Sequence, residues 1–254
     1  MIRPQLRPVI VEQALAAMPC TSCEARVHSA CSAIEDGDLH RLASMAHITE
    51  AQAGSVFVQE GDPADSFFNI SAGTARLFKQ LPDGRRQIVG FVGTGHFLGL
   101  AVSDTYAFTA EAIEPVRYCR FSRARMKTLM IDFPAMEQRL LSVAANELVA
   151  AQEQMLLLGC KTAIERMATF LLAQSVLGVP CGQPRSHLSL KMGRGDIADY
   201  LGMRIETVSR TLGRLKSEKL IELPSISDVV IRDRKALEAL ASDGSIAARR
   251  PSGR

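Results

Sequence analysis

Residues 195–215 read GDIADYLGMRIETVSRTLGRL, and this stretch is the most informative in the chain. Its apolar side chains keep helical spacing on both sides of a central glycine, at Ile197, Ala198, Leu201, Ile205, Val208, Leu212 and Leu215. The central Gly202 lacks a Cβ and can therefore adopt the left-handed turn that joins two crossed helices. The pattern predicts a helix-turn-helix, a motif whose second helix can enter the major groove of DNA.

The second predicted helix carries polar side chains outside its apolar stripe. They are Arg204, Glu206, Thr207, Ser209, Arg210 and Arg214, and together with Lys216 they form the predicted DNA-binding set. Side chains of these types can read base edges and hold phosphates. Residues 185–219 contain eight basic and four acidic residues, a local excess that exceeds the net charge of +3 of the whole chain. We therefore expect double-stranded DNA as a partner; the alternative is a solvated helix pair that binds protein.

The flanking segments predict a winged form of this unit. Residues 164–177 are amphipathic and indicate a helix that ends before Pro180. Residues 187–191 alternate like a short strand, and residues 220–223 and 229–231 are typical of a two-stranded wing.

Short β-rich runs punctuated by glycines occupy residues 48–121. The runs are residues 55–58, 66–70, 75–79 and 87–92. Between the last two, Pro82, Asp83 and Gly84 predict a hairpin turn, because glycine tolerates positive φ. Regular spacing of this kind is typical of an antiparallel barrel or jelly roll.

Composition and motifs narrow the class of protein. The 254 residues are 47% hydrophobic, which is enough to fill real cores. No apolar run approaches the roughly 20 residues that span a bilayer, so we expect a cytoplasmic protein without membrane association. A metal-dependent jelly-roll enzyme needs several histidines inside its barrel, whereas His96 is the only one in this region. We therefore expect no enzyme activity.

A long helix is predicted over residues 135–158, where helix-forming residues replace the glycines. Within it apolar and small residues recur at seven-residue spacing, at Leu141, Leu148 and Met155, with Ala144, Ala151 and Leu158 three residues after each. This is the a/d seam of a two-stranded coiled coil, so we predict a homodimer. The alternative is a single helix that packs on its own barrel.

Three cysteines, Cys20, Cys23 and Cys31, lie close together near the N-terminus in the spacing C-x2-C-x7-C. Six cysteines in a chain of this length are too few for a disulfide scaffold, so the cluster indicates metal or redox chemistry. Iron–sulfur clusters use about four thiolates, which leaves one ligand to be found elsewhere. A zinc site, a dithiol redox switch and inert thiols are the alternatives, and His28 in the same segment is a competing ligand.

The segment Ile205, Glu206, Thr207, Val208, Ser209, Arg210 resembles the recognition helix of the cyclic-AMP receptor protein and fumarate–nitrate reductase regulator (CRP/FNR) superfamily. The resemblance covers nearly the whole chain. It implies an α+β fold with an N-terminal cyclic-nucleotide-binding-like β jelly roll, a long dimerisation helix and a C-terminal winged helix-turn-helix. The expected divisions are a cysteine-rich cluster-binding segment (1–35), a jelly-roll sensor domain (36–125), a dimerisation helix (126–160), a winged helix-turn-helix domain (161–240) and a disordered tail (241–254).

The Glu-x-x-Ser-Arg pattern formed by Glu206, Ser209 and Arg210 is that of the FNR-type branch, and it implies that these residues read a TTGAT-type half-site. The family also implies RNA polymerase as a partner. The loop of residues 81–86 is a candidate contact, and a plain hairpin turn is the alternative. Some FNR-type proteins carry an acidic seam residue that separates the cluster-free protomers. The seam centre here is Ala151, which implies a dimer that persists without the cluster.

The same branch takes its fourth cluster ligand from a strand of the barrel, and Cys119 stands at that place. The resemblance therefore implies a [4Fe–4S] cluster on Cys20, Cys23, Cys31 and Cys119. Cys160 and Cys181 have no partners at ligand spacing and are interpreted as ordinary thiols. The implied function is oxygen-responsive control of anaerobic or microaerobic transcription at palindromic operators. The alternative is a family regulator without a cluster, responding to another effector or to thiol oxidation.

The barrel lacks the residues with which members of the superfamily bind cyclic nucleotides. Those members hold the ribose with a Gly-Glu pair and the phosphate with an Arg-Ser pair. Here Leu100 follows Gly99 where the Glu would stand, and residues 106–110 contain no Arg. Because a buried anion without a cation is costly, we expect no cyclic nucleotide and a pocket filled with side chains.

Overall fold

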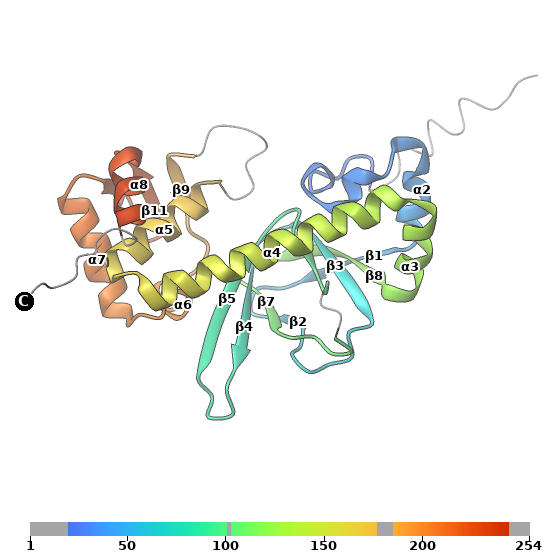
Figure 1. Ribbon diagram of the computed structural model, residues 1–254, viewed down its shortest axis with the longest axis horizontal. Helices are drawn as coiled ribbons and strands as arrows, with labels where there is room; N and C mark the ends of the chain where they lie inside the picture. Colours follow the sequence, from blue (N-terminus) through green and yellow to red (C-terminus); the bar gives the residue numbers. More distant parts are fainter. Residues whose placement is uncertain (1–19, 101–102, 177–184, 244–254) are drawn as a thin grey trace, which may run out of the picture. The chain divides into compact units, whose positions relative to one another are not determined.

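The computed structural model describes residues 20–100, 103–176 and 185–243 (Figure 1). Cys181 and most of the predicted tail lie outside these ranges. The chain forms two compact units, the first from residues up to Ala75 and from 92–146, the second from 76–91 and from Glu147 onward. Among the described helices, none combines the length and the apolar character needed to cross a membrane.

The first unit begins with a leader that packs into the core. Three short 3-10 helices, η1 (Arg26–His28), η2 (Ala30–Ala33) and η3 (Asp36–Asp38), precede helix α2 (Leu39–Ala43). Ala30, Ile34 and Leu39 are fully buried and join a core cluster with Phe97, Phe121 and Met136. Burial of these side chains holds the cysteine-bearing leader against the sheet.

An antiparallel sheet carries the rest of this core. Its strand order is β1 (Ala46–Ala51), β8 (Val116–Ser122), β3 (Ser66–Ala72) and β6 (Phe97–Leu98). In the same unit β2 (Val56–Val58) pairs with β7 (Thr109–Ala112). Aromatic rings pack between these strands. The ring centroids of Phe57 on β2 and Tyr118 on β8 are 4.9 Å apart. Those of Phe68 on β3 and Tyr106, which precedes β7, are 5.9 Å apart. The predicted jelly-roll class is confirmed.

Two helices follow the sheet, α3 (Arg123–Asp132) and α4 (Pro134–Cys160), with Phe133 between them. Pro134 has no backbone N–H to donate and therefore suits the first position of a new helix. The stretch 126–160 thus contains the end of α3 and all of α4. At 27 residues, α4 is about 40 Å long.

The second unit contains the hairpin of β4 (Ala75–Gln80) and β5 (Arg86–Val92), apart from its end residues, and the C-terminal helices. These helices are α5 (Ala163–Val176), α6 (Arg194–Leu201), α7 (Ile205–Ser217) and α8 (Arg234–Asp243). Gly202 joins α6 to α7 in the left-handed conformation with φ +60°, as predicted. Helices α6 and α7 therefore form the helix-turn-helix.

The wing has three strands, so the prediction of two was wrong. Its order is β10 (Ile221–Glu222), β11 (Asp228–Ile231) and β9 (His187–Ser189). Leu188 on β9 stands opposite Val229 on β11, and both side chains are buried. Pairing of these apolar residues joins β9, which sequence spacing indicates only as an isolated strand, to the wing.

Candidate functional site

Cys119 and Cys31 come from the sheet and the leader of the first unit. Cys119 lies on β8, an inner strand, opposite Ile48 of β1 and Asn69 of β3. Cys31 is buried in η2, and its backbone N–H donates to the hydroxyl of Ser29, the N-cap of that helix. The local fold thus fixes both cysteines on rigid elements.

All four predicted cluster ligands line one cavity. Its wall consists of Cys20, Cys23, Arg26, Cys31, Leu42, Asn69, Cys119 and Phe121. Cys20, Cys23 and Cys119 also line a neighbouring crevice. The fold therefore brings the three leader cysteines and the strand cysteine to the same place, although nearly ninety residues separate Cys31 from Cys119.

Burial raises the pKa of three of the thiols in this cavity. Burial, followed by repulsion from the other cysteines, raises the pKa of Cys119 to about 12. Burial likewise raises the pKa of Cys31 to about 11 and shifts the pKa of Cys20 upward, while Arg26 opposes both shifts. Reactive cysteines have lowered pKa values, so these three thiols lack the character of a redox-active nucleophile. Their ionisation needs a nearby positive charge, such as a bound metal.

Two polar atoms on the cavity residues are buried without a hydrogen-bond partner among the described residues, Arg26 Nε and Asn69 Oδ1. The remaining Arg26 nitrogens are occupied, since Nη2 donates to the carbonyl of Ile34 at 2.7 Å and Nη1 donates to Asp36. Unsatisfied buried polar atoms are rare in folded proteins and call for an explanation.

The described residues contain no group of three or more His, Cys, Asp or Glu placed to hold a metal ion, and the four cysteines of this cavity are no exception. The competing ligand His28 is not among the cavity residues. It packs instead against Gly95, where an added Cβ would lie 2.6 Å from the Cβ of His28. Cys160 is exposed at the end of α4.

The predicted DNA-binding residues lie on and just before α7. Arg204, Glu206, Ser209, Arg210, Arg214 and Lys216 are exposed, and Thr207 is half-buried. On the opposite face Val208, Leu212 and Leu215 are buried. Arg214 forms an ion pair with Glu218 at 2.8 Å, whereas Arg210 forms no ion pair within the described residues. The amphipathic helix therefore offers a polar face that can contact DNA.

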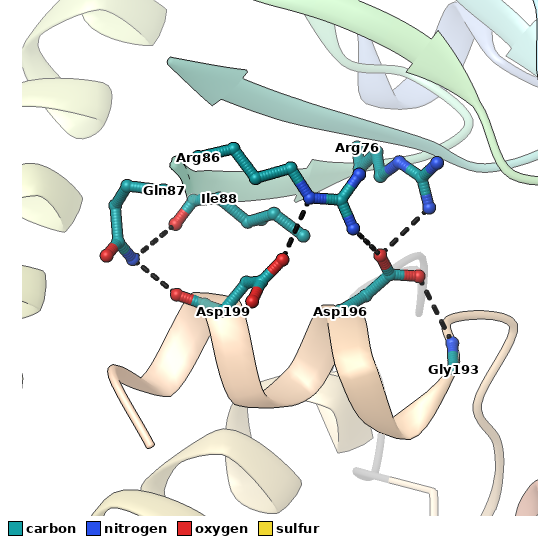
Figure 2. Close-up of polar contacts among 7 residues, drawn as sticks. All are labelled: Arg76, Arg86, Gln87, Ile88, Gly193, Asp196 and Asp199. Atoms are coloured by element: carbon teal, nitrogen blue, oxygen red, sulfur yellow. Dashed lines mark hydrogen bonds and ion pairs between the residues drawn. The ribbon is translucent and has the colours of Figure 1, made fainter. Parts of the chain in front are cut away.

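The hairpin β4–β5 clips onto α6, as Figure 2 shows. Arg76 Nη1 and Arg86 Nη2 both donate to Asp196 Oδ1, at 2.8 and 3.0 Å. Arg86 Nε also donates to Asp199 Oδ2 at 2.8 Å, and Gln87 donates to the carbonyl of Asp199. Sequence reasoning missed this clip, which fixes the first helix of the helix-turn-helix.

The predicted seam of α4 carries large apolar side chains that the described residues leave exposed. Leu141, Leu148 and Met155 are 71%, 61% and 72% exposed. Of the small and flanking seam positions, Ala151 is exposed, and Ala144 and Leu158 are half-buried. An apolar stripe of this kind on a soluble surface marks an interaction site.

The segment that corresponds to the ribose-binding site is built on packing contacts. Gly99 has φ +90°, and an added Cβ would lie 2.8 Å from the carbonyl oxygen of Ser66. Arg123 Nη2 donates to the carbonyl of Gly99 at 2.6 Å, and Leu100 packs against the core cluster. Tyr106 donates its hydroxyl proton to the carbonyl of Ser66.

Two domain families match the chain, "Cyclic nucleotide-binding domain" over residues 48–132 and "Crp-like helix-turn-helix domain" over residues 165–240. Transcriptional activatory protein AadR of Rhodopseudomonas palustris is 39% identical over 87% of this chain and 92% of its own length. Nitrogen fixation regulation protein FixK of Bradyrhizobium diazoefficiens is 36% identical over 88% of this chain and 94% of its own. The solved structure of FixK2 from Bradyrhizobium japonicum gives a TM-score of 0.72 at 32% identity and covers 78% of this chain and 98% of that one.

Proposed function

The chain belongs to the CRP/FNR family of transcriptional regulators, and we propose that it is an oxygen-responsive member that binds a [4Fe–4S] cluster and controls anaerobic or microaerobic genes. Regulators of this family act as dimers, and they bind DNA through a helix-turn-helix. The observation that carries the proposal is the gathering of Cys20, Cys23, Cys31 and Cys119 around one cavity.

The chemistry of the cavity fits such a cluster. Four thiols are the usual donor set for a cubane, in which each thiolate binds a different iron atom. This arrangement differs from a single-ion site, where all ligands meet at one metal. One of the two unsatisfied polar atoms, Arg26 Nε, is a donor on the same wall without a protein partner in the described chain, so an anionic cluster could accept its hydrogen bond. A bound cluster supplies iron and sulfide that react with oxygen.

For DNA, we propose that Glu206, Ser209 and Arg210 read a TTGAT-type half-site. The Arg210 guanidinium can donate two hydrogen bonds to guanine, and the Glu206 carboxylate can accept from cytosine. Two protomers joined along the α4 seam place their recognition helices in successive major grooves about 34 Å apart. The pairing of half-sites raises affinity through effective concentration, so a small change at the seam alters operator occupancy strongly.

The loop between β4 and β5 is the proposed contact with RNA polymerase. Leu81 is half-exposed there, and Arg85 pairs with Asp83 at 2.8 Å in an exposed turn. A charged, exposed hairpin tip offers a surface to a protein partner.

The alternative function is a family regulator without a cluster that responds to thiol oxidation at the same cysteines. Ultraviolet–visible spectra of protein purified without air separate the two functions. We expect a brown protein with broad visible absorption and about four irons per protomer. A colourless, iron-free protein overturns the cluster.

Cysteine variants test the ligand set. We expect Cys119→Ser to lose most of its iron, because one of four thiolates is removed. Cys160→Ser is the matched control, since Cys160 is an exposed cysteine outside the cavity, and it should retain wild-type iron. Equal iron in both variants contradicts the assignment of Cys119.

A further inference from the structure

Asn69 is a buried amide that packing alone does not explain. It is 2% exposed on β3, between the buried Phe68 and Ile70. Within the described residues its Nδ2 finds one partner, the Sγ of Cys31 at 3.7 Å, and its Oδ1 finds none. Because sulfur is a weak acceptor, one such bond does not offset the cost of burying an amide. An apolar residue of the same size would stabilise this core position better.

The register of the sheet places Asn69 beside a second candidate ligand. Asn69 stands directly opposite Cys119 in the antiparallel pairing of β3 and β8. Side chains at directly opposite positions lie on the same face of the sheet as close neighbours. Asn69 therefore touches the leader ligand Cys31 and adjoins the strand ligand Cys119.

Arg26 brings positive charge to the same wall. It lines the same cavity as Cys20 and Cys31. Its guanidinium is anchored by Ile34 and Asp36, which leaves the buried Nε without a partner among the described residues. A fixed cation and an amide donor beside four thiols form a surrounding suited to a negatively charged sulfur cluster.

We propose that Asn69 is a positioning residue for the bound cluster, whose N–H···S hydrogen bond holds Cys31 as a ligand and raises the reduction potential, with Arg26 as the accompanying cation. The inference rests on the proposed cluster. A donor to a ligand sulfur stabilises the reduced state more than the oxidised state, because the reduced cluster carries more negative charge.

The test compares Asn69→Leu with Asn146→Leu, the same substitution at an exposed site on α4 outside the seam. Protein purified without air is analysed for iron and titrated spectroelectrochemically. Loss of one net hydrogen bond should shift the ratio of oxidised to reduced cluster at a fixed potential about two- to tenfold towards the oxidised form. Asn146→Leu should match wild type. An unshifted Asn69→Leu with full iron overturns the inference.

A second variant covers the case in which leucine expels the cluster. Asn69→Ala removes the amide donor with a side chain too small to press on the cluster, so it should shift the ratio in the same direction. A shift towards the reduced form contradicts the proposal. The Asn69→Leu protein can also lose its iron. If its iron-free form then unfolds at the same temperature as iron-free wild type, the loss supports the role of Asn69 in holding Cys31.

The outcomes separate the inference from the proposed function. An iron-free wild-type protein overturns both. A brown wild type whose Asn69 variants keep its iron content and its potential overturns the role of Asn69 alone and leaves the cluster in place.

Discussion

The roles proposed for individual side chains on α7 are of two kinds, recognition of bases and binding of phosphates. Arg210 is exposed on the recognition face beside Ser209, while Lys216 lies nearly two turns further along the helix. We expect Arg210→Ala to weaken binding to the specific operator by about 1–3 kcal/mol and to relax discrimination at one base position. Fluorescence anisotropy with a panel of single-base operator variants measures both effects.

Lys216→Ala is the companion variant for this prediction. It should weaken binding to all sequences alike and reduce the slope of log affinity against log salt by about one. An Arg210→Ala protein that loses affinity equally for every sequence would place Arg210 on the phosphate backbone and contradict its assigned role.

Residue-level prediction from the sequence reached only part of the cysteine site. The close spacing identifies Cys20, Cys23 and Cys31 as a candidate site. Cys119 was identified only through family resemblance, because nearly ninety residues separate it from Cys31. Asn69 gave no signal, because its place beside Cys119 depends on the register of β3 against β8.

At the level of elements, the clip between the hairpin and α6 should contribute measurable stability. We expect Arg76→Gln to lower the free energy of unfolding by about 1–3 kcal/mol, because the Arg76 and Asp196 side chains are only 18% and 10% exposed. Arg85→Gln removes the same charge from an exposed position nearby and should change stability by less than about 0.5 kcal/mol. Chemical denaturation measures both variants, and equal effects would show that the clip has no structural weight.

Elements with strong periodicity were predicted closely, and elements defined by distant pairing were not. The helix expected over residues 135–158 is observed as α4, Pro134–Cys160, and the helix-turn-helix turns at Gly202 as expected. The strand β9 was predicted, but its pairing with the wing was missed, because β9 and β11 are about forty residues apart in sequence. The attachment of the hairpin to α6 was missed for the same reason, since Arg86 and Asp199 are 113 residues apart.

For the whole molecule, the exposed seam of α4 is the proposed dimer interface. Leu148→Glu places like charges opposite each other in the proposed dimer, so we expect the dimer to weaken about 100-fold or more. Ala150→Glu introduces the same charge at an exposed position of α4 outside the seam and should stay dimeric. Sedimentation equilibrium gives both association constants, and a dimeric Leu148→Glu protein would place the interface elsewhere.

In the proposed function, a cluster bound in the cysteine cavity of one unit controls DNA binding by the other unit. The most direct test follows the visible spectrum and operator binding in one anaerobic sample while air is admitted in steps. We expect cluster absorption and operator occupancy to fall together. The Cys119→Ser protein should show neither cluster absorption nor operator binding at the start. Operator occupancy that stays constant while the cluster absorption disappears would contradict the proposed function.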